Sequence, residues 1–163
     1  MPDAKFETRF REELEFLYDA EKQIIDAFPQ MIAAAFSEDL AAALQSELDE
    51  TKEQVGRLER IFQAMGEEPG LNECQGMKGL ILEGENLVSR LEKSPVRDVG
   101  IIEAAQKVKN YELCGYEAVR ALAELLGQQE AADALEQTID EERSAHEDLS
   151  GIAEAILAGH SSP

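Results

Sequence analysis

The feature that most constrains this chain is the helical spacing of its apolar residues, which continues over almost the whole sequence. Residues three and four positions apart share one face of an α-helix, so this spacing predicts long amphipathic helices. Glycine and proline, which interrupt helices, are concentrated in a few short segments. We predict four long helices, which run from about Lys5 to Phe36, from about Glu38 to Met65, from about Asp98 to Leu126 and from about Gln129 to Leu157.

The connections between these helices indicate how they are arranged. Ser37 is typical of a helix start, and Gly66 and Gly127 are typical of helix ends. The first helix is joined tightly to the second, and the third to the fourth, so the members of each pair must be antiparallel neighbours. About thirty residues separate the second helix from the third, including a loop at 67–72 and a weaker helical segment at 73–93. We therefore expect an all-α fold: a ferritin-like four-helix antiparallel bundle with a long helical crossover between helices 2 and 3.

Length and charge limit the classes of function. The 163 residues fit one ferritin-like domain, 1–163, with a frayed tail from about residue 159. Lys+Arg 15 against Asp+Glu 35 leaves a formal net charge of -20, which argues against a nucleic-acid partner and an anionic membrane surface. There is neither an apolar run of about 18 residues nor the apolar segment of a signal peptide at the start. We expect a cytoplasmic protein with reduced cysteines, Cys74 and Cys114.

Three of the predicted helices carry a glutamate where a core residue is expected. The apolar stripe of the first helix contains Glu21, that of the third contains Glu112, and that of the fourth contains Glu142. His146 follows Glu142 by one helical turn. The other members of these stripes are Leu14, Leu17, Ile24 and Phe28 in the first helix; Ala105, Val108, Gly115, Val119, Leu122 and Leu126 in the third; and Ala131, Leu135, Thr138, Ala145, Leu149, Ile152 and Ile156 in the fourth. Three carboxylates are thus predicted to point into one interior.

The second helix is less regular. Glu47 and Gln54 lie within its apolar arc, and Glu50 lies at the edge of that arc. The separation of Glu50 from Glu21 is nearly that of Glu142 from Glu112, and Gln54 follows Glu50 by one turn as His146 follows Glu142. This repeated spacing indicates a duplicated helix pair, in which each half supplies one glutamate from its first helix and a glutamate plus a second ligand from its next.

Several buried carboxylates need compensation, because an unpaired ionised carboxylate costs several kcal/mol to bury. A single inward glutamate is commonly a hydrogen-bonded core residue, but three in a repeated pattern favour a shared site. Basic side chains are an alternative source of charge, yet those near the stripes read as solvated: Lys22, Lys52, Arg57, Lys109 and Arg143. Two divalent cations would balance four carboxylates, and bundles hold dinuclear sites through such inward acids. A site of several carboxylate oxygens with one nitrogen or amide ligand suits iron, and manganese is the second choice.

At these residues the sequence resembles the YciE/YciF family of ferritin-like proteins, from about Phe6 to Leu149. The resemblance is carried by several segments: Leu17 to Ile24, Glu50 and Thr51 with Gln54 to Glu59, Cys74 to Leu80, Ala104 to Gln106 with Tyr111 and Glu112, and Thr138 to Glu142. It implies a ferritin-like fold, a carboxylate-bridged two-metal site and a ferroxidase or stress-protective role. Carried over residue by residue, it implies that Glu21, Glu50, Glu112 and Glu142 are the ligands.

The chain also departs from the family pattern. Glu47 stands where the family tends to have histidine, Lys109 and Asn110 replace a usual Glu-His, and His146 stands where aspartate is common. These departures change which nitrogen ligands the resemblance implies, and they bear on the choice of metal.

Two functions are compatible with these residues. The first is a di-metal protein, with iron favoured by the ligand types, which takes up metal ions and reacts with dioxygen or peroxide as a ferroxidase-type oxidoreductase. Its metal residues would be Glu21, Glu50, Glu112, Glu142, His146 and Gln54. The second is a structural or stress-related helical bundle in which the metal site is non-catalytic or empty. The acidic surface alone would also suit a partner-binding bundle, and the width of the predicted helix faces suggests a homodimer.

Overall fold

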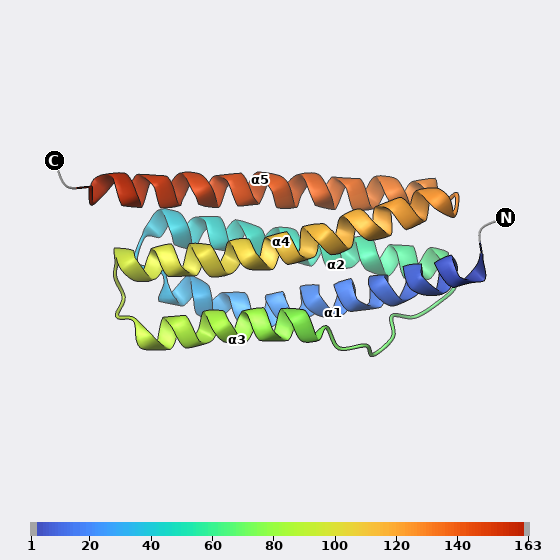
Figure 1. Cartoon of the computed structure of the whole chain (residues 1–163), viewed down its shortest axis with the longest axis horizontal. Helices are drawn as coiled ribbons and strands as arrows, with labels where there is room; N and C mark the ends of the chain where they lie inside the picture. The colour runs from blue at the N-terminus through green and yellow to red at the C-terminus, as the bar shows by residue number, and fades with distance from the viewer. Residues whose placement is uncertain (1–2, 162–163) are drawn as a thin grey trace.

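The computed structural model describes residues 3–161, which form helices joined by short connections (Figure 1). The all-α expectation is confirmed. The long helices are α1 (Ala4–Ala34), α2 (Glu38–Ala64), α4 (Pro95–Leu125) and α5 (Gln129–Gly159), and the shorter helix α3 (Gln75–Arg90) lies between α2 and α4 in the chain. The predicted ends of α1, α2 and α5 agree with the structure within about two residues, which is the usual uncertainty of a helix end.

Helix starts follow the expected capping chemistry. The Ser37 hydroxyl accepts a hydrogen bond of 3.3 Å from the backbone N–H of Leu40, and the Asp3 carboxylate accepts one of 2.9 Å from that of Lys5. Ser94 caps α4 in the same way, with Pro95 in the first turn. Helix α4 therefore begins three residues earlier than the predicted Asp98, because proline is compatible with the first helical position, where no N–H is needed.

The long helices form a closed ring in which α1 packs on α2, α2 on α5, α5 on α4 and α4 on α1. Chain direction reverses between neighbours in this ring, as Figure 1 shows. After α2 the chain runs back through a loop and α3, so that α4 starts at the end of the molecule where α2 also starts (Figure 1). Helix α3 lies outside the ring and packs on α1 and α4.

The glycines that interrupt the pattern around α3 are points of close helix approach. A Cβ atom added at Gly84 would lie 2.9 Å from Cε of Met31 and 3.3 Å from Cβ of Ala104. One added at Gly100 of α4 would lie 2.6 Å from Cδ2 of Leu87. The glycines at these two contacts thus accompany tight packing of α3 against α1 and α4, because a side chain there would displace the ends of Met31 or Leu87.

The core consists of two apolar clusters, one toward each end of the bundle. One is built around Ile24, Phe28, Leu44 and Ile101, and the other around Phe10, Leu14, Phe62 and Leu135. The predicted stripe of α1 is entirely buried, and so are the apolar residues that define the arc of α2: Leu44, Leu48, Val55, Leu58 and Phe62. In the second half of α4 the predicted Val119 is buried, but Tyr116 and Ala123 are buried in place of the predicted Gly115 and Leu122, which are half-buried. The predicted stripe of α4 beyond Glu112 was therefore right at Val119 and wrong by one position at Gly115 and Leu122.

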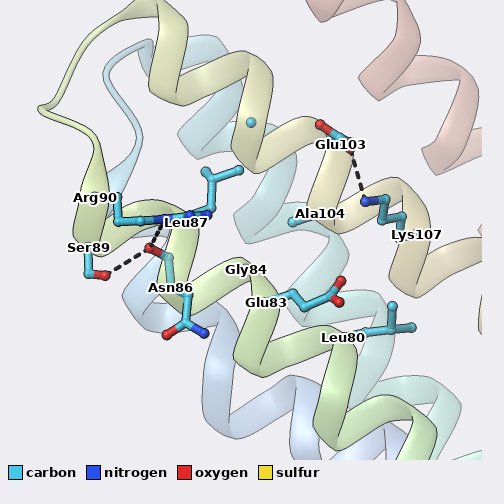
Figure 2. Close-up of a pocket in the computed structure, with 11 residues that line it drawn as sticks. Leu80, Glu83, Gly84, Asn86, Leu87, Ser89, Arg90, Glu103, Ala104 and Lys107 are labelled. Carbon is cyan, nitrogen blue, oxygen red and sulfur yellow. Dashed lines mark hydrogen bonds and ion pairs between the residues drawn. The ribbon is translucent and has the colours of Figure 1, made fainter.

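The surface carries a cleft of about 550 Å³ between α3 and α4, shown in Figure 2. Its lining includes Leu80, Leu87 and an exposed ion pair of 3.0 Å between Lys107 Nζ and Glu103 Oε1. Within residues 3–161, no helix has the length and apolar character that crossing a membrane requires.

Candidate metal centre

A layer of buried polar side chains separates the two apolar clusters. It receives Glu21 from α1, Glu47 and Gln54 from α2, Lys109, Glu112 and Tyr116 from α4, and Glu142 from α5, and each of these residues is at most 4% exposed. The predicted inward orientation of Glu21, Glu112 and Glu142 thus agrees with their burial. Whether these residues bind metal stays a prediction. We call this layer the acid centre.

One side of the acid centre is organised by a lysine, and we call it the lysine side. Lys109 Nζ lies 3.2 Å from Glu47 Oε2, and 3.4 Å and 3.3 Å from Oε1 and Oε2 of Glu142. The amide nitrogen of Gln54 donates a hydrogen bond of 3.1 Å to Glu142 Oε1. The expectation that Lys109 is solvated was wrong: its ammonium neutralises acids from two other helices inside the bundle.

The other side, which we call the carboxyl side, contains Glu21, Glu112 and Tyr116. Neither carboxylate oxygen of Glu21 has a hydrogen-bond partner among the described residues, and the same holds for Glu112 Oε2 and the Tyr116 hydroxyl. Buried polar atoms without partners are uncommon in folded proteins and call for an explanation. The carboxyl side thus has no counter-charge among the described residues, whereas the lysine side has Lys109. On the lysine side, Glu47 Oε2 lies 3.2 Å from Lys109 Nζ but forms no hydrogen bond within residues 3–161, and Gln54 Oε1 forms none there either.

The carboxyl groups on both sides are hard to ionise. Burial raises the pKa of Glu21 to about 7; a hydrogen bond from the Glu112 carboxyl, which Glu112 can donate only when protonated, opposes this increase, and the charge of Glu142 adds to it. Burial, followed by the charges of Glu142 and Glu21, raises the pKa of Glu112 well above its usual value. Burial raises the pKa of Glu47 to about 7, although Lys109 opposes this. Burial alone would lower the pKa of Lys109, but the acids around it outweigh burial and raise that pKa.

A second group of polar residues closes the rim of the acid centre. Arg57 donates two hydrogen bonds of 2.6 Å and 2.7 Å to the carboxylate of Glu141, and one of 3.1 Å to the Thr138 hydroxyl. Burial would raise the pKa of Glu141, but the hydrogen bonds from Arg57 and then Gln54 outweigh this and lower it. Arg57 is buried, so the expectation that it is solvated was also wrong. Lys22, Lys52 and Arg143 are exposed as expected.

The structure separates the remaining predicted ligands by position. Glu50 is half-buried at the rim, and burial followed by the charge of Glu141 raises its pKa. Glu47, which comes one turn earlier on α2, occupies the buried position instead. Gln54 lies inside the acid centre, and its carbonyl oxygen is unpartnered among the described residues. His146 is half-buried, and its backbone carbonyl accepts a hydrogen bond of 3.3 Å from the Gln106 amide.

Sequence reasoning missed Lys109, Arg57 and the full burial of Tyr116, and a signal for each was present. Lys109 lies three positions before Glu112, and Tyr116 lies four positions after it, so all three share one helix face. Arg57 lies three positions after Gln54 on α2. A long basic side chain at such a position can reach the interior, because its apolar stem packs in the core while its charged end pairs with an acid.

These residues fit one cation better than two. The unpartnered oxygens of Glu21 and Glu112 are hard donors of the kind that iron and manganese prefer, and no basic side chain in residues 3–161 forms a hydrogen bond with them. Glu47 and Glu142, by contrast, are already paired with Lys109. In residues 3–161, no three His, Cys, Asp or Glu side chains converge closely enough to hold an ion, so binding requires side-chain rotation. A two-ion arrangement that uses Glu142 as a bridge does not fit this conformation.

Long antiparallel helices with an acid centre between two apolar clusters define an all-α bundle protein with a buried polar layer. Residues 5–160 match the family model described as Domain of unknown function (DUF892), and the chain belongs to this family. It is 38% identical to Protein YciF of Escherichia coli (strain K12) over 140 residues, which cover 83% of this chain and 82% of that protein. The resemblance to the YciE/YciF family is confirmed.

Solved structures agree with this assignment. The crystal structure of the E. coli stress protein YciF is similar with a TM-score of 0.91 and 33% identity, covering 94% of this chain and 97% of that one. YcfI of Rhodopseudomonas palustris has a TM-score of 0.86 and 34% identity, covering 89% and 92%. A Xanthomonas campestris protein at 17% identity, with a TM-score of 0.75 and 94% coverage of both chains, shares the fold alone.

Proposed function

We propose that this protein is a single ferritin-like domain that binds a divalent metal, iron first and manganese second, in its acid centre. The observation that supports the proposal is the set of unpartnered oxygens on Glu21 and Glu112 in a dry interior. Such oxygens are costly to bury, and a divalent cation would compensate them. The ligands would be Glu21 and Glu112, with the Gln54 carbonyl oxygen beside them, and Glu142 would join them only by releasing Lys109.

The chain's own residues would control access to this metal and its environment. The apolar clusters on both sides of the acid centre exclude water along the bundle axis. The ion pair of Arg57 with Glu141 holds the rim closed next to Gln54. The half-buried Glu50 provides a carboxylate at the rim that an entering cation would meet first. Bound iron would supply electron exchange with dioxygen or peroxide, which is the ferroxidase-type activity to be tested.

A stress-related role is the physiological part of the proposal. Its support is similarity to YciF of E. coli, which is described as a stress protein. The cytoplasmic location, the absence of a nucleic-acid or membrane partner, and association as a homodimer stay predictions.

The test is metal content and Fe(II) oxidation. We expect metal in the protein as purified without added metal, and absorbance growth when Fe(II) is added in air. Glu21→Gln combined with Glu112→Gln should abolish both, while the exposed Glu103→Gln should leave both unchanged. Metal-free protein that neither takes up nor oxidises iron would refute the proposal.

A second candidate is a structural or stress-related bundle whose centre holds no metal. Lys109 already supplies a positive charge to two of the acids, which favours this candidate. The raised pKa values of Glu21 and Glu112 favour it as well, because protonated carboxyl groups can be buried without a cation. Under this candidate, Glu112→Gln would change no measurable binding or activity.

A further inference from the structure

The chain has two cysteines, and the fold brings both of them to one surface cavity. Cys74 comes directly before α3, and Cys114 lies on α4. Both are free thiols, with Cys74 buried and Cys114 exposed. They line the same cavity of about 300 Å³, whose other walls include Leu17 and Ala20 of α1. The tertiary structure therefore places two oxidisable groups, which are far apart in the sequence, around one space at the surface.

The position of Cys74 beside this cavity is fixed by α1. Its backbone N–H donates a hydrogen bond of 2.7 Å to Asp19 Oδ2, and its carbonyl oxygen accepts one of 3.1 Å from the side-chain amide of Gln23. A hydrogen bond of 2.6 Å joins Gln23 to Asp19. The thiol of Cys74 thus has a defined place, although a loop precedes it.

The third member of this group is Tyr111 of α4, which comes one helical turn before Cys114. Its hydroxyl lies 3.3 Å from Sγ of Cys74. Its ring packs on the first turn of α3, where a Cβ atom added at Gly76 would lie 2.6 Å from Cζ of the ring. The hydrogen bond with Cys74 and burial raise the pKa of Tyr111 to about 12, and the charge of Cys114 contributes to the same shift. Both cysteines therefore lie close enough to Tyr111 to act on its hydroxyl.

The side chains around the cavity have room to rearrange. A disulfide needs two Cβ atoms about 3.5–4.5 Å apart, so the thiols must turn toward each other. Tyr111 is 41% exposed, and its ring can rotate outward to uncover Cys74. On the α4 wall of the cavity, Gly115 and Ala118 are small and leave space for this rotation.

We infer that Cys74 and Cys114 form a reversible redox site, in which a hydroperoxide converts the two thiols into one disulfide. The thiolate of the exposed Cys114 attacks one peroxide oxygen, the O–O bond breaks, and the leaving oxygen takes up the proton that the thiol lost. Cys114 is then a sulfenic acid. The sulfur of Cys74 attacks the sulfur of Cys114, and the hydroxyl group leaves as water with the proton of the Cys74 thiol. The two thiols lose two electrons, which reduce the hydroperoxide to an alcohol or water. This site does not depend on metal in the acid centre.

The test is oxidation of the metal-free, full-length protein with hydrogen peroxide in the presence of a chelator. We expect the thiols that are counted in denaturant to fall from two to none, and the intact mass to fall by two hydrogen atoms. Peptide mapping should show a bond between Cys74 and Cys114 within one chain, and dithiothreitol should restore both thiols. Two persisting thiols, bonds only between copies, or oxidation of Cys114 beyond sulfenic acid with Cys74 unchanged would each overturn the inference. Because no metal is present, none of these results decides the proposed function.

Single variants test the order of the two steps. In Cys74→Ala, Cys114 should accumulate as a sulfenic acid that dimedone traps, because the second thiol is missing. In Cys114→Ala, Cys74 should stay reduced over the same time, because it is only 3% exposed. Trapping of equal amounts of sulfenic acid in the unsubstituted protein and in Cys74→Ala would show that Cys74 does not react with Cys114, and would overturn the inference.

The matched control moves the exposed thiol along α4 and away from the cavity. It combines Cys114→Ala with Glu117→Cys, at a residue that is also exposed but whose side chain pairs with Arg143 of α5. This variant should form no bond to Cys74. An equal yield of the bond in the control would mean that the shared cavity does not select the pair, and would contradict the inference.

Discussion

The two sides of the acid centre are equally dry but differ in how their charges are balanced. On the lysine side, Lys109 contacts Glu47 and Glu142 at 3.2 Å and 3.3 Å. On the carboxyl side, Glu21 has no hydrogen-bond partner for either oxygen among the described residues. The comparison shows that burial alone does not decide whether an acid in a bundle is structural or functional. What decides it is whether the same core also contains its counter-charge.

The largest effect on stability is expected from removing that counter-charge. Lys109→Met should destabilise the metal-free protein by about 3–5 kcal/mol, because it leaves buried acids without a partner. Lys107→Met, at the exposed pair with Glu103, should cost less than about 1 kcal/mol. Urea unfolding of both variants at pH 8 measures the difference. Equal losses would show that the two sides of the acid centre do not differ as described.

The next effect is a dependence of stability on pH. In the folded state the pKa values of Glu21 and Glu47 are about 7, above the ordinary value of 4.5, so the folded protein binds more protons than the unfolded chain between these pH values. The metal-free protein should therefore lose stability as the pH rises from about 4.5 to about 7, by an amount on the order of 3 kcal/mol for each of the two groups.

Unfolding free energies at pH 5 and pH 8 test this, and Glu21→Gln should flatten the slope because glutamine does not titrate. The exposed Glu103→Gln should leave the slope as it is in the unsubstituted protein. A slope of the opposite sign would mean that Glu21 is ionised at little cost in the folded protein.

A smaller effect is expected at two glutamates, where the same substitution should change the stability of the metal-free protein in opposite directions. Glu112→Gln should stabilise the metal-free protein at pH 8 by about 1–2 kcal/mol, because it removes a buried carboxylate that no cation serves. Glu142→Gln should destabilise it by about 1–3 kcal/mol, because Lys109 loses a charged partner. Thermal melting of both variants without metal measures the signs. The same sign for both would remove the distinction between the two sides.

The smallest effect is expected at the rim. Arg57→Gln should cost about 1 kcal/mol, because the carboxylate of Glu141 reaches solvent and can be rehydrated. It should leave the Mn(II) stoichiometry unchanged, since Arg57 does not contact Glu21 or Glu112. A change in the number of bound ions would extend the acid centre to the rim. Elemental analysis and urea unfolding of this variant provide the two readouts.

Helix positions and inward acids could be predicted because they depend on local pattern. The stripe of α1 that contains Glu21 is buried at every predicted position, and the Ser37 cap forms as expected. The pattern of α4 was less reliable, because a glycine at 115 and a tyrosine at 116 offered two phases. Packing selected Tyr116, whose ring joins the second apolar cluster.

The prediction of Glu50 instead of Glu47 as the inward acid of α2 was also limited by a helix pattern that allows two phases. Both lie near the apolar arc of α2, and the repeated spacing favoured Glu50. In the structure Glu47 is buried beside Lys109 and Glu50 stays at the rim. The rotation of α2 about its own axis depends on its contacts with α1 and α5, which the pattern of a single helix does not contain.

By itself, the sequence determined that the chain is helical, where the long helices begin and end apart from the start of α4, and that Glu21, Glu112 and Glu142 face inward. These properties follow from periodicity and capping within single helices. Only the tertiary structure decided which charge meets which acid. Lys109 reaches Glu47 and Glu142 because α4, α2 and α5 have a particular axial offset and rotation, and ion pairing depends on distances of a few ångströms between helices that are far apart in the chain.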